Sequence, residues 1–139
     1  MPYRCALLLT GALLAQAQAP VTMKQLMLDL IHPAANDILL SINRGGPQND
    51  AEWATARRAA ITLASDPLSA RGPRNQEDWA KSAKMLSDAG MAAYKAAQAK
   101  DADALAAVAQ SIDQSCTACH QQFRPNVFPR PASEKGGSQ

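Results

Sequence analysis

The sequence contains few of the residues that usually carry chemistry. It has 3 cysteines and 2 histidines in 139 residues, and aromatic side chains make up only 4%. A structural zinc site needs about four protein ligands, so nearly all of these residues would have to converge on one ion. The sequence shows no set of nucleophile, acid and base, and we therefore do not predict an enzyme.

The chain also lacks a charge excess. Its 14 basic and 12 acidic residues give a net charge of +2, which favours neither nucleic acid nor an anionic membrane surface as a partner. Its single long apolar run covers residues 5–14, after Arg4 and before Ala15-Gln16-Ala17. This order is typical of a secretory signal peptide. We predict a signal peptide at 1–17, export, and no membrane span after its removal.

Alanine is abundant, and hydrophobic residues make up 47% of the chain, a composition typical of a helix-rich globular domain. We predict one all-α domain, an antiparallel four-helix bundle over residues 18–124, followed by a loose tail at 125–139. The predicted helices cover about 21–42, 49–65, 75–99 and 101–123.

The first predicted helix has an apolar stripe and a proline within it. The stripe recurs at steps of three and four and consists of Met23, Met27, Leu30, Ala34, Ile38 and Ile42. Pro33 should kink or split this helix near His32. The inward positions of the other three helices are mostly alanine, with Gly90, which leaves room in the core for a bulky apolar group.

The last predicted helix ends with Cys116-Thr-Ala-Cys119-His120. The two cysteines are three residues apart, so they share one helix face, and that face carries the apolar stripe of this helix. A redox dithiol normally lies at a helix N-terminus, whereas this pair lies near a C-terminus. Zinc would require His32 as a fourth ligand. Covalent attachment of one haem c, with His120 as an axial iron ligand, fits the motif best; zinc and thiol chemistry stay as alternatives.

These residues resemble the class II cytochromes c, the cytochrome c′ and c-556 group. The resemblance rests on the motif with Phe123-Arg124 after it, on 25–27, on 31–35, and on Trp53 with 59–64, and it extends over about 21–125. It implies a four-helix bundle with one covalently bound haem in the core, a periplasmic location and often a homodimer. The redox partner protein is not specified by the sequence.

In that family the first helix supplies the residue over the distal haem face. A methionine there implies a six-coordinate iron and electron transfer, whereas an apolar residue implies an open position that binds NO or CO. Met27 matches this position, and it also lies on the inner stripe. The alternatives are an open position or ligation by Met23 or His32. His32 follows Met27 by five residues, which in a regular α-helix turns it well away, so both cannot reach one iron unless Pro33 distorts the helix. We expect His32 to be a surface histidine or a neighbour of the ligands. Arg124 is a candidate neighbour of His120 or of a haem propionate.

Overall fold

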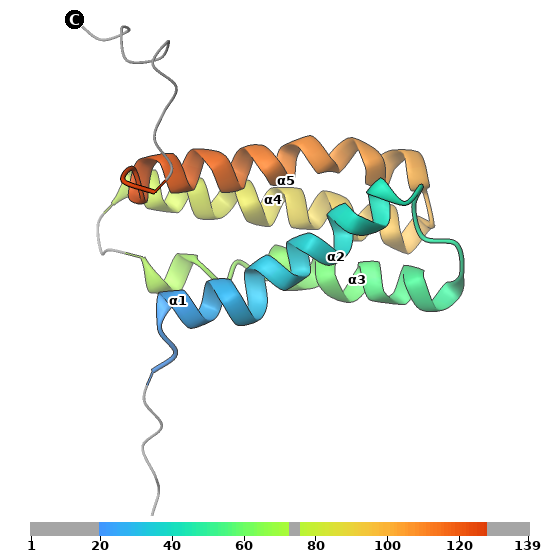
Figure 1. Ribbon diagram of the computed structural model, residues 1–139, viewed down its shortest axis with the longest axis horizontal. Coiled ribbons are helices and arrows are strands. Elements are labelled where there is room, and N and C mark those ends of the chain that lie inside the picture. The colour runs from blue at the N-terminus through green and yellow to red at the C-terminus, as the bar shows by residue number, and fades with distance from the viewer. Residues whose placement is uncertain (1–19, 73–75, 128–139) are drawn as a thin grey trace, which may run out of the picture.

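The computed structural model describes residues 20–72 and 76–127, which form four antiparallel helical segments (Figure 1). The first segment consists of three consecutive pieces, α1 (Met23–Leu26), the π-helical turn η1 (Met27–Ile31) and α2 (His32–Asn43). It is followed by α3 (Asp50–Ala64), the 3₁₀ turn η2 (Ser69–Arg71), α4 (Glu77–Ala99) and α5 (Ala102–Phe123). The predicted all-α four-helix bundle is confirmed.

Some sequence-based predictions fall outside these residues. The signal peptide at 1–17, the helix start at 75 and the tail from 128 onward all lie outside the described ranges. Within those ranges, no helix combines the length and the apolar character needed to cross a bilayer.

Side-chain caps explain where several helices begin. Asn49 accepts the backbone N–H of Glu52 at 3.0 Å, and Asp101 accepts that of Ala104 at 2.9 Å. Each of these bonds satisfies a first-turn donor that has no partner inside its helix. The α2 helix ends before Gly45 and Gly46, whose φ angles of 94° and 88° favour glycine. The predicted boundaries therefore hold to within a few residues.

The first segment departs from the predicted continuous stripe at η1. Pro33 has no N–H to donate to the carbonyl of Asp29, and its ring would crowd that carbonyl. The chain forms a π-turn instead, in which the N–H of His32 donates to the carbonyl of Met27. The wider turn shifts the helix phase, so Leu30 is 41% exposed while Ile31 is buried. The predicted place of Leu30 in the stripe was wrong for this reason.

The four segments pack in a ring. The α3 helix packs against α2 and α4, and α5 packs against α4 and α2. Alanines fill much of the interface, which lets the helices approach closely. Gly90 of α4 is the extreme case, because an added Cβ there would lie 2.4 Å from the backbone nitrogen of Ala64.

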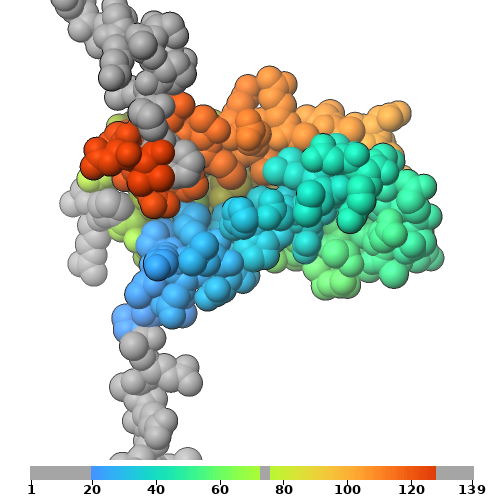
Figure 2. Space-filling model, viewed as in Figure 1, coloured from blue at the N-terminus to red at the C-terminus, as the bar shows by residue number. Residues whose placement is uncertain are grey.

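Because the four segments run alternately up and down, the first and the last of them have their outer ends at the same end of the bundle. The beginning of α1 and the end of α5 lie at the same end of the molecule (Figures 1 and 2). Arg71 donates a hydrogen bond to the carbonyl of Val21 just before α1, and Gln122 of α5 donates to Asp78 of α4 at 2.9 Å. The cysteine motif therefore faces the first helix across the open end of the bundle.

Candidate cofactor site

The motif occupies the last two turns of α5. Cys119 is buried, and Cys116 and His120 are partly buried. Cys116 nevertheless packs against the hydrophobic core. Both thiols thus lie on the inner side of α5, as their spacing predicted, although Cys116 is more open to solvent than expected.

Beside the motif lies a cavity with two lobes, of about 540 and 450 Å³. Such volumes fall in the range of small-molecule and cofactor sites. The lobes adjoin, because five residues line both of them: Met27, Leu28, Cys119, His120 and Arg124. The cavity therefore separates η1 from the end of α5.

The first lobe is bounded by aromatic side chains. Trp79 and Phe123 meet edge to face, with their ring centroids 4.9 Å apart and an angle of 71° between the planes. The indole N–H of Trp79 donates to the carbonyl of Leu68 at 3.0 Å, which fixes the ring. Met23 and Lys24 complete this lobe on the α1 side. Trp79 thus combines the packing role predicted for it with a place in the cavity wall.

The second lobe contains Cys116 and extends along the first helical segment. Ile31, His32 and Ala35 line it from that segment, and Ser82 and Leu86 line it from α4. His32 was predicted to turn well away from the face of Met27, but both residues line this lobe. The prediction applied to a regular α-helix, and η1 is the distortion before Pro33 that it excepted. His32 is exposed, as expected of a surface histidine.

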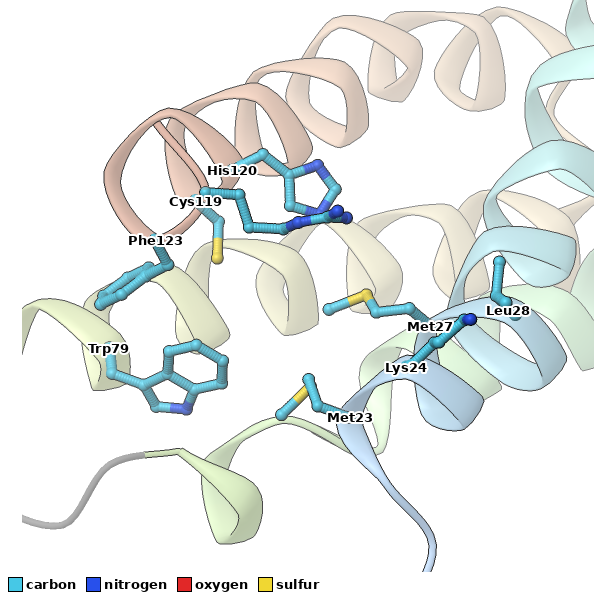
Figure 3. Close-up of a pocket in the computed structure, with 9 residues that line it drawn as sticks. Met23, Lys24, Met27, Leu28, Trp79, Cys119, His120 and Phe123 are labelled. Atoms are coloured by element: carbon cyan, nitrogen blue, oxygen red, sulfur yellow. The ribbon is translucent and has the colours of Figure 1, made fainter. Parts of the chain in front are cut away.

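Figure 3 shows how the labelled side chains of the first lobe lie. Met27 extends from the first helical segment toward α5, and Cys119 and His120 project from α5 into the same space. Met23 lies one turn before Met27, on the side of Trp79. A group held at the cysteines would therefore lie between His120 on one helix and the methionines on another.

Burial sets the electrostatics of the motif. It raises the pKa of Cys119 and Cys116, and a hydrogen bond with Ser82 partly offsets this rise at Cys119. Burial also lowers the pKa of His120, and the positive charge of Arg124 lowers it further. These shifts favour the protonated thiols and the neutral imidazole.

Arg124 lies immediately beyond the helix. Its backbone N–H donates to the carbonyl of His120 at 2.7 Å, and its side chain lines both lobes. A guanidinium at a cavity wall can pair with a carboxylate of a bound group.

Residues 73–124 match the family model described as cytochrome c′. Over this stretch the chain is similar to the class II cytochromes c. The match supports a c-type haem cytochrome, and the family implies a haem cofactor. The matched residues include α4, α5 and the whole motif, whereas Met27 lies outside them. No curated protein and no solved structure matches the chain.

The cavity fits a haem better than it fits the alternative groups. Its walls are mostly apolar, and it opens directly beside the two thiols and the imidazole. In the described part of the chain, no three Cys, His, Asp or Glu side chains gather as a metal site, which argues against zinc. The raised pKa values of the thiols argue against dithiol exchange, which needs thiolates.

Sequence reasoning identified the motif but missed part of the cavity wall. Leu68, Ser82 and Leu28 were not predicted to line a site, although all three do. Ser82 could have been found, because it follows Trp79 by three residues and so shares its helix face. Leu68 lies in the connection between helices, where periodicity gives no information.

Proposed function

We propose that the protein is a periplasmic c-type cytochrome that carries single electrons. Cys116 and Cys119 would hold one haem through thioether bonds, His120 would be the proximal iron ligand, and Met27 would be the distal ligand. The periplasmic location rests on the predicted signal peptide at 1–17 and on the family. A homodimer stays a prediction, and the sequence does not specify the redox partner.

One observation supports this proposal most directly. Met27 reaches into the cavity from the first helical segment, and His120 reaches into it from α5 (Figure 3). A thioether and an imidazole on opposite walls form the ligand pair of six-coordinate c-type haem.

The chain contributes orientation and environment to this function. When bound, haem supplies one-electron redox chemistry. The neutral imidazole of His120 would donate a nitrogen lone pair to the iron, and the sulfur of Met27 would favour the reduced state and so raise the potential. Apolar walls such as Ile31 and Leu86 limit the access of water. Arg124 would pair with a propionate or modulate His120, whose pKa its charge lowers.

The second candidate function is binding of NO or CO at an open iron position. Apolar residues line the cavity next to Met27, namely Leu28, Ile31, Ala35 and Leu86. Without ligation by Met27, this wall would offer no other thioether in the second lobe. The two functions therefore differ in what Met27 does.

Absorption spectroscopy of the exported, haem-loaded protein tests both functions. We expect a haem c spectrum, a ferric charge-transfer band from methionine ligation, and a ferrous spectrum that changes little on addition of CO. Met27→Leu should abolish the methionine band, since leucine has similar volume but no sulfur. Met23→Leu is the matched control and should keep the band.

Two results would contradict the proposal. A purified protein without haem would exclude both functions. A high-spin wild type that binds CO readily would exclude Met27 ligation and favour gas binding.

A further inference from the structure

We propose that His32 is a second iron donor on the side of the cavity where Met27 lies, and that it occupies the iron position when Met27 is removed. This inference rests on the proposed function. It assigns a role to a residue that lies outside the segment matched to the cytochrome c′ family model.

The π-turn provides the geometric reason. In a regular α-helix, five residues advance the direction of a side chain by about one turn and a further 140°. In η1 the hydrogen bond runs from the N–H of His32 to the carbonyl of Met27, so these five residues complete one wider turn. His32 therefore lies one turn beyond Met27 on nearly the same side.

The cavity contacts agree with this direction. His32, Met27 and His120 all line the second lobe, and Cys116 lies in its wall. His32 is an exposed residue, which agrees with a place at the mouth of the lobe rather than deep inside it. A thioether and an imidazole from successive turns thus flank the same space opposite His120.

The hydrogen bonding of His32 leaves one ring nitrogen available. Nδ1 lies 3.4 Å from the side-chain amide of Asn36, on the next turn of α2. There Nδ2 of Asn36 donates to Nδ1, which puts the proton of the neutral imidazole on Nε2. A 180° rotation of the amide would let its oxygen accept Nδ1–H and would leave Nε2 without a proton. Nε2 has no hydrogen-bond partner among the residues that the structure describes. With the amide of Asn36 rotated in this way, His32 has the tautomer that binds metal through Nε2.

The test uses electron paramagnetic resonance and absorption spectra of five haem-loaded proteins: the wild type, Met27→Leu, His32→Ala, Met27→Leu/His32→Ala and Met27→Leu/Asn36→Ala. We expect Met27→Leu to lose the methionine band but to keep a low-spin bis-histidine signal. Met27→Leu/His32→Ala should become high-spin, and its apparent CO affinity should rise about tenfold or more over that of Met27→Leu, because no internal ligand competes. The asparagine variant keeps the imidazole and should stay low-spin.

The outcomes separate this inference from the proposed function. If Met27→Leu and Met27→Leu/His32→Ala share one spin state and one CO affinity, His32 does not reach the iron and the inference is wrong. That result holds whatever the wild-type spectrum says about Met27. If the wild type lacks the methionine band but His32→Ala alone makes it high-spin, the role of Met27 is wrong and the role of His32 is supported. Circular dichroism of each variant controls for loss of the fold.

Discussion

At the scale of single residues, burial determines how the motif of α5 behaves. The same α5 helix that hides Cys119 from water also places His120 beside Arg124. Burial and positive charge both disfavour the imidazolium form, and the pKa of His120 lies below its ordinary 6.5 as a result. In the proposed function His120 binds iron as a neutral imidazole, and the lowered pKa favours that form before any haem is present.

This shift predicts a pH dependence in the haem-free chain. Between the lowered folded-state pKa of His120 and the unfolded value near 6.5, the unfolded chain binds more protons than the folded one. The free energy of unfolding should therefore increase with pH through this window and fall as the pH drops below 6.5. Urea unfolding on both sides of this pH measures the slope.

His120→Gln is the control for this measurement, because it removes the titrating group. Its slope in the same window should be smaller than that of the parent chain. If the free energy of unfolding of the parent chain decreased with pH in this window, burial would not be the main cause of the shifted pKa of His120.

At the scale of elements, η1 decides which side chains of the first helical segment face the cavity. Two causes hold this turn. One is local, the missing N–H of Pro33. The other is tertiary, since Leu26 before the turn is 6% exposed and Ile38 beyond it is fully buried. Regular α-helix between them would move one of these two side chains out of the core.

Pro33→Ala separates the two causes. The variant can gain a backbone hydrogen bond of about 0.5–1.5 kcal/mol, whereas exposing Leu26 or Ile38 costs about 1.5–3 kcal/mol. Because the burial is worth more than the hydrogen bond, we expect η1 to persist in Pro33→Ala and the methionine band of the haem-loaded protein to remain. Absorption and nuclear magnetic resonance of the methionine methyl group check this. Loss of the band in Pro33→Ala would mean that the proline alone holds the turn.

At the scale of the whole molecule, α3 and α4 are in close contact, whereas the end of the bundle that carries the motif contains a cavity. The α3 and α4 helices meet at Gly90, where an added Cβ would lie 2.7 Å from the Cβ of Leu63 and nearer still to the backbone of Ala64. Toward the motif the bundle opens into the cavity between η1 and α5. The tight contact fixes the helices whose ends form the cavity wall.

Gly90→Ala should therefore destabilise the protein, against the trend of helix propensity. Alanine at an exposed helical site is more stable than glycine by about 1 kcal/mol, but the clash with the α3 backbone should cost about 1–3 kcal/mol beyond that gain. Ala92→Gly, on the exposed face of α4, is the control and should cost about 1 kcal/mol. Denaturant unfolding measures both changes, and a stabilised Gly90→Ala would contradict the close contact.

The sequence alone was sufficient wherever the physics is local. Helix starts follow from caps such as Asn49 and Asp101, which bond within three residues of themselves. The common face of Cys116 and Cys119 follows from their spacing, and so does the family resemblance of the motif. These features need no knowledge of what packs against them.

The tertiary structure alone decided how the first helical segment meets the end of α5. A regular period put Leu30 inward and His32 away from Met27, and η1 breaks that period. Pro33 predicted a kink or break in the first helix. That the helix forms a π-turn there depends on burying Leu26 and Ile38 together, and this burial involves helices far along the chain. The cavity wall, with Leu68 and Ser82 in it, likewise arises only when four segments close into one ring, because no single helix encloses space.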